Sequence, residues 1–158
     1  RAMYNTALRM VQNPHDAEDI LQSIFIEVFG KLDTFRYESS IGAWIKRITV
    51  NKCINFLKSR RLAFSELTQH NDRAEETAPE TEPVYSAERI NHAIGELPDG
   101  YRIVFSLYAL EGYDHEEIAQ VLGITEATSK SQYSRAKARL REMLTTNHRT
   151  MTRNPLTR

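Results

Sequence analysis

The chain has 158 residues, enough for one ordinary domain or two small helical ones. Its 21 basic and 21 acidic side chains balance, so net charge by itself indicates no class of partner. Cys53 is the only cysteine, which excludes an intrachain disulfide and a cysteine-based zinc site, and the histidines are too scattered for a metal cluster. We therefore expect no metal site.

Charge is segregated along the chain. Lys and Arg dominate residues 39–65 and 130–158, whereas Asp and Glu dominate residues 14–38 and 66–88. Two basic segments separated by acidic ones predict two contacts with a polyanion, with the acidic segments facing another partner. We find no apolar run long enough to span a membrane and no signal-peptide pattern, so we expect a cytoplasmic protein without membrane insertion.

The N-terminal part predicts two helices. The first covers residues 2–12, and the Asn-Pro pair at 13–14 ends it. Because the sequence opens on Arg1 and not on a start methionine, we expect this helix to begin before it. The second covers about Asp16 to Leu32 and begins with acidic residues, which the helix dipole favours. Its broad apolar face consists of Ala17, Ile20, Leu21, Ile24, Phe25, Val28 and Phe29.

A polar loop at residues 35–40, FRYESS, precedes a third helix predicted over 41–61. At about 100° per residue, this helix has a polar strip on one side and an apolar face on the other. The strip consists of Arg47, Asn51, Asn55 and Lys58, and the apolar face of Ile41, Ile45, Ile48 and Phe56. Asparagine is a mediocre helix former, so two on a basic strip indicate hydrogen bonding to a partner. Trp44 either flanks this strip or packs in the core.

Between residues 67 and 84 large apolar side chains nearly vanish, while Glu, Thr and Pro accumulate. This composition buries too little surface to offset the entropy of ordering, so we predict a flexible acidic linker. Helices resume at about Ser86, and Pro98 separates two of them. Residues 101–110 form the most apolar run of the C-terminal part and are predicted to be buried. Beyond Leu144 the periodicity is lost, and we expect a disordered tail.

Residues 113–141 predict two helices separated by a short turn. Asp114 is placed to cap the first helix together with Glu117, Gly123 ends it, and Thr125 can cap the second. The second helix has an apolar face, Tyr133, Ala136, Leu140 and Leu144, and a polar face, Lys130, Ser134, Lys137 and Arg141. This is the helix-turn-helix plan, which places the second helix in the major groove of DNA. The alternative is an ordinary helical hairpin with a solvated basic face.

Both halves together resemble one family, the extracytoplasmic-function (ECF) sigma factors of bacterial RNA polymerase. The N-terminal resemblance rests on DAEDILQSIF at 16–25, FRYESS at 35–40 and WIKRITVNKCINFLKSRR at 44–61. The C-terminal resemblance rests on LPDGYRIVF at 97–105 and GYDHEEIAQVLGITEATSKSQYSRAKARLR at 112–141.

The resemblance implies an all-α protein of two small helical domains. A three-helix sigma region 2 domain would cover residues 1–62, a flexible acidic linker 63–85, and a four-helix sigma region 4 domain 86–144, followed by a disordered tail at 145–158. Such a protein binds core RNA polymerase and directs promoter-specific transcription initiation by recognising minus-10 and minus-35 elements. The polymerase performs all chemistry, so the resemblance implies neither catalytic activity nor a cofactor.

The resemblance also implies three sets of binding residues. Core polymerase, through its clamp helices, would be bound by Asp16, Asp19, Gln22, Ile26 and Glu27, and the C-terminal domain would contact the β flap. The minus-10 element would be bound by Phe35, Ser39, Trp44, Arg47, Asn51, Asn55, Lys58, Arg60 and Arg61. The minus-35 element would be bound by Thr128, Lys130, Ser131, Gln132, Ser134, Arg135 and Lys137. An anti-sigma factor would be a further partner.

Two positions depart from the commoner family pattern. Gln132 stands where arginine is usual, which we expect to redirect specificity towards adenine. Ser129 stands where a β-branched apolar residue is usual, which we expect to weaken one core contact. Two other functions remain open at this point: a stand-alone LuxR-like helix-turn-helix regulator, and a sigma-like adaptor that docks on polymerase without reading DNA.

Overall fold

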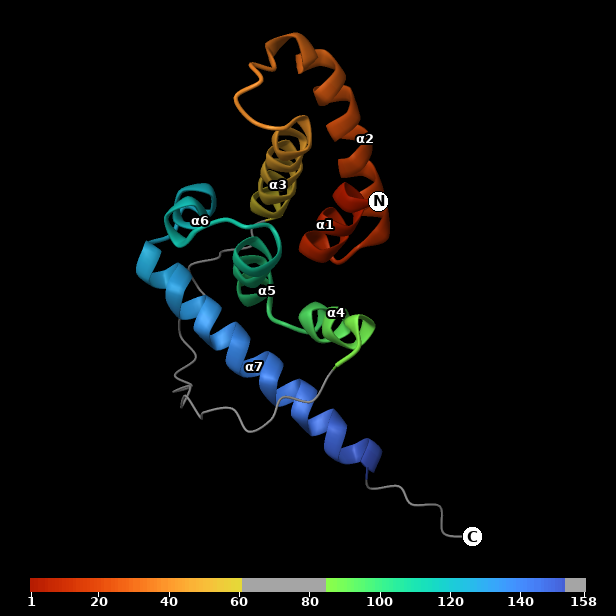
Figure 1. Cartoon of the computed structure of the whole chain (residues 1–158), viewed down its shortest axis with the longest axis vertical. Coiled ribbons are helices and arrows are strands. Elements are labelled where there is room, and N and C mark those ends of the chain that lie inside the picture. Colours follow the sequence, from red (N-terminus) through yellow and green to blue (C-terminus); the bar gives the residue numbers. More distant parts are fainter. Residues whose placement is uncertain (61–84, 153–158) are drawn as a thin grey trace. The chain divides into compact units, whose positions relative to one another are not determined.

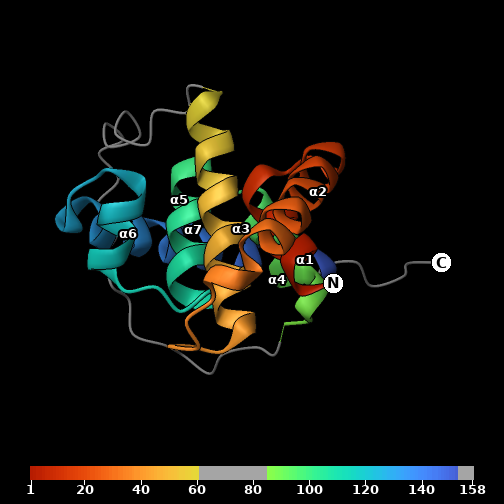
Figure 2. The ribbon, with the colours of Figure 1, turned by 90° about the horizontal axis from the view of Figure 1, so that it is seen from above.

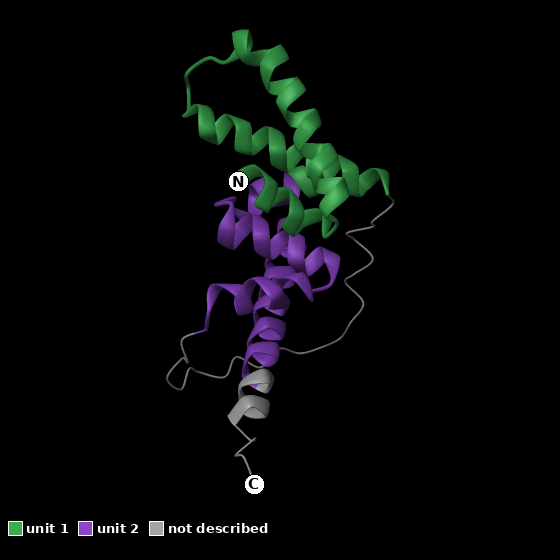
Figure 3. Cartoon of the chain, turned by 90° about the vertical axis from the view of Figure 1, so that its right-hand side faces the viewer, with its two compact units in different colours: residues 1–64, 121–123 green, residues 65–120, 124–158 purple. Residues whose placement is uncertain are grey.

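The computed structural model describes residues 1–60 and 85–152, with side chains described as far as residue 145 (Figure 1). The chain divides into two compact units, residues 1–64 with 121–123 and residues 65–120 with 124–158 (Figure 3). Within the described residues all regular structure is helical, which confirms the predicted all-α class. No described helix is both long and apolar enough to cross a membrane.

The first unit contains α1 (Ala2–Val11), α2 (Pro14–Lys31), the short 3-10 helix η1 (Leu32–Thr34) and α3 (Ile41–Ser59). Each of the three α-helices packs against the other two (Figures 1 and 2). Their shared core consists of Ala7, Met10, Ala17, Ile20, Ile24, Val28, Val50, Cys53, Ile54 and Leu57. Cys53 is buried in this core, where it packs as a small apolar side chain.

The predicted break between the first two helices is confirmed, and its chemistry is local. Gln12 ends α1 in the left-handed conformation at φ 57°. Asn13 then caps α2, with its side-chain oxygen accepting a hydrogen bond from the Asp16 amide at 3.2 Å. Pro14 occupies the first helical position, where its missing N–H costs nothing.

The apolar face predicted for α2 is too broad. Ala17, Ile20, Ile24 and Val28 are buried, but Phe25 and Phe29 are 54% and 73% exposed. Because α1 and α3 pack against one side of α2, the helix has one covered stripe, and Phe25 and Phe29 beside that stripe remain in solvent. The face predicted for α3 is only partly covered. Ile41 is exposed, Ile45, Ile48 and Phe56 are half-buried, and the buried residues are Thr49, Val50, Cys53, Ile54 and Leu57.

The second unit contains α4 (Ala87–Gly95), α5 (Asp99–Phe105), which continues into the π-helical turn η3 (Ser106–Leu110), most of α6 (His115–Leu122) and α7 (Glu126–Thr152). Both α4 and α5 pack against α7. The core between α4 and α7 is formed by Ala93, Ile94, Leu97, Ala136 and Leu140. Of the apolar run at 101–110 that was predicted to be buried, Ile103, Val104 and Leu107 are fully buried, but the end of the run at Tyr108, Ala109 and Leu110 is exposed.

The end of the second unit differs from the prediction. We expected the helical domain to end at Leu144, but α7 continues to Thr152, about two further turns. Thr145 already belongs to this helix, and its hydroxyl donates to the Arg141 carbonyl at 2.7 Å. No Gly or Pro occurs before Pro155, so no residue type interrupts the helix in this stretch. The rest of the expected tail, and nearly all of the expected linker, lie outside the described residues.

Candidate nucleic-acid interface

The polar strip predicted on α3 is exposed. Arg47, Asn51, Asn55 and Lys58 are all exposed, and they lie on a different side of α3 from most of its buried residues. Their amide and cationic side chains can bond base edges and phosphate oxygens. The helix therefore offers a strip about three turns long to a polyanion.

An aromatic cluster lies where the polar loop enters α3. The Phe35 ring packs against the Trp44 ring at 5.3 Å between centroids and against the Tyr37 ring at 4.8 Å. Ser40 holds the start of the helix by accepting a hydrogen bond from the Ala43 amide at 3.2 Å. Ser39 is exposed beside it. Phe35 and Trp44 are half-buried, so each has a face in the cluster and part of its surface in solvent.

Tyr37 was missed by the sequence interpretation. It is 86% exposed and has a positive φ of 58°, a conformation that non-glycine residues rarely adopt. The aromatic spacing within FRYESS was the available signal, but the backbone conformation that brings Tyr37 against Phe35 is not visible in the sequence. The cluster thus has three rings, one more than the predicted binding residues include.

The predicted polymerase-binding residues of α2 fall into two groups. Asp19, Gln22 and Ile26 are exposed, and Ile26 is 76% exposed. Asp16 and Glu27, in contrast, are engaged within the unit. Asp16 pairs with Arg60, which was predicted to bind DNA phosphates and which also lies over the Phe56 ring. Arg61, predicted for the same role, lies outside the described residues.

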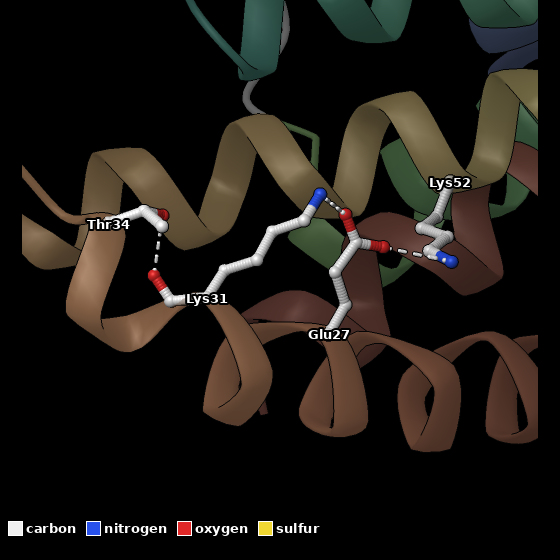
Figure 4. Close-up of polar contacts among 4 residues, drawn as sticks. All are labelled: Glu27, Lys31, Thr34 and Lys52. Carbon is white, nitrogen blue, oxygen red and sulfur yellow. Dashed lines mark hydrogen bonds and ion pairs between the residues drawn. The ribbon is translucent and has the colours of Figure 1, made fainter.

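Glu27 bridges two lysines (Figure 4). Its carboxylate oxygens lie 2.6 Å from the Lys31 ammonium and 2.9 Å from the Lys52 ammonium, so the residue ties α2 to α3. The hydrogen bonds from Lys31 and then Lys52 lower the pKa of Glu27 below its ordinary value. In the same view the Thr34 hydroxyl donates to the Lys31 carbonyl at 2.7 Å and closes the end of α2.

The predicted helix-turn-helix is confirmed in its local details. The Glu117 amide donates to the Asp114 carboxylate at 2.8 Å, and the Asp114 amide donates back to the Glu117 carboxylate at 3.0 Å. Gly123 ends α6 at φ 72°. Thr125 caps α7 by accepting a hydrogen bond from the Thr128 amide at 3.1 Å.

The two faces predicted for α7 are also observed. Ala136 and Leu140 are buried, whereas Lys130, Ser134, Lys137 and Arg141 are exposed. Lys130 pairs with Glu126 one turn earlier at 2.6 Å. Thr128, Ser131 and Arg135 are half-buried at the edge of the exposed face. All except one of the residues predicted to bind the minus-35 element thus have surface available to a duplex.

Gln132 is the exception, and its predicted contact with adenine stays a prediction that the burial of the side chain disfavours. Its side chain is 0% exposed, because it projects from the buried side of α7. Ser129 is also 0% exposed, which agrees with its predicted place in the core. Its hydroxyl, however, makes a hydrogen bond with His115 at 2.9 Å, a polar contact where we had expected only a weakened apolar one.

Comparison with known proteins shows matches in both halves of the chain. Residues 1–63 match the model of Sigma-70 region 2, and residues 87–140 match that of Sigma-70, region 4. The ECF RNA polymerase sigma factor SigE of Mycolicibacterium smegmatis is 31% identical over 147 residues, covering 90% of this chain and 57% of SigE. The ECF RNA polymerase sigma factor SigM of Mycobacterium tuberculosis is 30% identical over 144 residues, covering 91% of this chain and 72% of SigM.

Two solved structures are also similar. The sigma factor RpoE of Bartonella quintana, in complex with the anti-sigma factor NepR, has a TM-score of 0.60 at 24% identity and covers 91% of this chain and 90% of its own. CnrH, in complex with the cytosolic domain of CnrY, has a TM-score of 0.53 at 27% identity and covers 92% of this chain and 81% of its own. The RpoE likeness supports the fold alone.

Proposed function

The chain belongs to the ECF sigma factors, and on that premise we propose that it binds core RNA polymerase and directs promoter-specific initiation by recognising minus-10 and minus-35 elements. One observation carries the proposal. A helix-turn-helix with an exposed cationic face occurs in the same chain as a separate helical unit whose α3 exposes an Asn-rich basic strip. A stand-alone regulator has no need of the second strip.

Docking on polymerase is assigned to α2. Phe25, Ile26 and Phe29 are all more than half exposed on this helix, and such apolar side chains are the usual anchors of a protein interface. Asp19 and Gln22 lie exposed on the same helix. Carboxylates around an apolar anchor steer the encounter with a basic partner such as the polymerase clamp helices. Asp16 and Glu27 contribute to docking indirectly, because their ion pairs with Arg60 and with Lys31 and Lys52 hold α2 in place.

Recognition of the minus-10 element is assigned to the aromatic cluster and the polar strip of α3. An unpaired base turned out of the stack needs an aromatic or apolar wall and hydrogen bonds to its edge. Phe35, Tyr37 and Trp44 supply the wall, and Ser39 stands beside it. The amides of Asn51 and Asn55 bond base edges, while Arg47, Lys58 and the Arg60–Arg61 pair hold phosphates.

Recognition of the minus-35 element is assigned to α7, with its first turns in the major groove. Lys130 and Arg135 are suited to guanine edges or phosphates. Thr128, Ser131, Ser134 and Lys137 complete the contact. Neither unit need bind tightly alone, because tethering raises the effective concentration of the second contact. The polymerase forms the phosphodiester bonds in the cytoplasm, and this chain contributes no catalytic group or cofactor.

An anti-sigma factor is a further proposed partner. CnrH was solved with the cytosolic domain of CnrY bound, and the exposed phenylalanines of α2 are the type of surface that a bound protein partner covers. The same helix would then serve either polymerase or inhibitor.

The test is run-off transcription with core polymerase on a genomic promoter library. We expect transcripts whose start sites share two elements at a constant spacing, and no transcripts without the protein. Tight binding to a promoter duplex without polymerase would favour the LuxR-like regulator. Docking on core polymerase without any transcript would favour the adaptor.

A further inference from the structure

A partly buried hydrogen bond joins the two helices of the helix-turn-helix behind the proposed DNA-facing surface. His115 is the first residue of α6, and Ser129 lies in the first turn of α7. The His115 Nδ1 and the Ser129 Oγ lie 2.9 Å apart, and Ser129 is 0% exposed. This bond therefore fixes the start of one helix against the start of the other.

The imidazole of His115 is itself held by aromatic rings from a third element. It stacks on the ring of Tyr108 in η3, with centroids 4.3 Å apart and planes at 15°. The edge of the Tyr133 ring of α7 meets it at 5.7 Å, and Tyr133 also stacks on Phe105 at 5.8 Å. A ring with this many neighbours has little freedom to rotate, so the position of its Nδ1 is defined by the core.

Ser129 stands between two residues assigned to the minus-35 duplex, Thr128 and Lys130. The apolar packing of α7 against α4 is centred further along, at Ala136 and Leu140. Base contacts of a helix-turn-helix come from the N-terminal part of the second helix, which here is the part that Ser129 holds. A small rotation at Ser129 would displace both neighbours relative to the base edges they read.

We propose that His115 and Ser129 are positioning residues that set how the first turns of α7 are presented to the minus-35 element. Neither side chain touches DNA. They act through the orientation of Thr128 and Lys130, and this role rests on the function proposed above. The pair also explains why a serine occupies an otherwise apolar core position. Its hydroxyl fixes the position of the helix start, whereas an apolar side chain would only fill space.

Three variants test the pair. His115→Phe keeps a flat ring to stack on Tyr108 and removes Nδ1, Ser129→Ala removes only the hydroxyl, and the double variant removes both. Ser106→Ala is the matched control, because Ser106 is also a buried serine of this unit, at 1% exposed, and its hydroxyl has no hydrogen-bond partner in the described part of the chain. Circular dichroism first establishes that each variant is folded at the assay temperature.

The readout is transcription with core polymerase from a promoter library in which the minus-35 element is randomised and the minus-10 element is constant. We expect each single variant to reduce discrimination between the best minus-35 sequence and its single-base variants by about two- to ten-fold, the effect of one hydrogen bond. The double variant should lose no more than either single variant, because both remove the same bond. Ser106→Ala should keep the wild-type preference.

The outcomes separate the two proposals. Unchanged base preference in both folded single variants, with an active wild-type protein, overturns the positioning role but leaves the sigma function intact. Additive losses in the double variant overturn the pairing. A wild-type protein that gives no promoter-dependent transcript overturns the proposed function, and the positioning role falls with it.

Discussion

The guanidinium of Arg60 holds the carboxylate of Asp16 with both of its terminal nitrogens. Nη2 donates to Oδ1 at 3.0 Å, and Nη1 lies 3.0 Å from Oδ2. The two residues are 44 positions apart and join the end of α3 to the start of α2. An ion pair therefore joins α2, the proposed polymerase-binding helix, to α3, the proposed minus-10-binding helix, within one unit.

This pair makes the DNA contact of Arg60 dependent on Asp16. In Asp16→Asn the arginine is released, so we expect the salt dependence of minus-10 single-strand binding by the holoenzyme to steepen by about 0.7 in log K against log salt, one additional phosphate contact. Folding stability should change by no more than about 1 kcal/mol, because the Arg60 side chain is 57% exposed. Asp19→Asn, on the exposed surface of the same helix, is the control and should leave the slope unchanged. An unchanged slope in Asp16→Asn would mean that Asp16 does not control the contact between Arg60 and DNA.

Asn51→Ala should impair minus-10 recognition and leave core polymerase binding intact. Asn51 is exposed on α3, whereas the docking residues lie on α2. The measurements are affinity for core polymerase and open-complex formation on a fixed promoter. Asn5→Ala provides a matched exposed asparagine on α1 and should affect neither. Equal loss of both activities in Asn51→Ala would count against the assignment.

Arg135→Ala should weaken minus-35 binding by about 1–3 kcal/mol and relax specificity at one position, if the side chain contacts a guanine. Arg135 is half-buried, so a second variant, Arg135→Met, separates loss of the charge from loss of packing, because methionine retains the packing of the aliphatic stem. Binding of holoenzyme to promoters that differ at single minus-35 positions gives the answer. Arg139→Ala, an exposed arginine on α7 that pairs with Glu142, should have no such effect. A uniform loss across sequences would identify a phosphate contact.

Gln132→Ala should reduce the free energy of unfolding and leave base preference largely unchanged. Truncating a fully buried polar side chain removes both its packing and its polar contacts, so the free energy of unfolding should fall by about 1–3 kcal/mol. Ser134→Ala, exposed on the other face, should change it by no more than about 0.5 kcal/mol. Urea denaturation measures both. A Gln132 variant of normal stability with altered base preference would place that side chain on the DNA after all.

Acid should destabilise the second unit through His115. Burial, followed by the positive charge of Lys130, lowers the pKa of His115, while Glu126 and Asp114 act in the opposite direction; its other neighbours are the uncharged phenols of Tyr108 and Tyr133. The unfolded chain therefore takes up a proton at a higher pH than the folded unit does. Stability is undiminished above about pH 6.5 and falls as the pH drops below that value.

His115→Phe should remove this part of the pH dependence. The difference in unfolding free energy between wild type and variant, measured by urea denaturation from about pH 8 to pH 5, should shrink as the pH falls below 6.5. His92 and His15 are present in both proteins and cancel in the comparison. A difference that grows on acidification would show that the folded unit prefers the charged ring.

Local chemistry explains why much of the fold could be predicted. Each cap acts between residues at most three or four positions apart, so both partners are visible in the local sequence. Examples are the capping pair of Asp114 and Glu117, the left-handed Gly123 and the cap at Thr125. The exposed strip of α3 was predictable for the same reason, because polar side chains one turn apart define their own face.

Tertiary structure decided which of several apolar or charged residues were covered. Phe25 and Phe29 follow the helical spacing of the buried residues of α2, yet they are exposed. The packing of α1 and α3 against α2 determines where its covered stripe ends. Gln132 was predicted to contact DNA, yet it is fully buried, on the same side of α7 as the buried Ser129 and Ala136.

By itself, then, the sequence determined the helices, their caps and the two separate strips proposed to face a polyanion, because hydrogen bonds near in the chain and helical periodicity need no distant partner. Only the tertiary structure decided that Asp16 meets Arg60, that Glu27 meets Lys52 and that Ser129 meets His115. These pairs join different helices, and whether two such side chains meet depends on how the helices pack, which neither segment encodes alone.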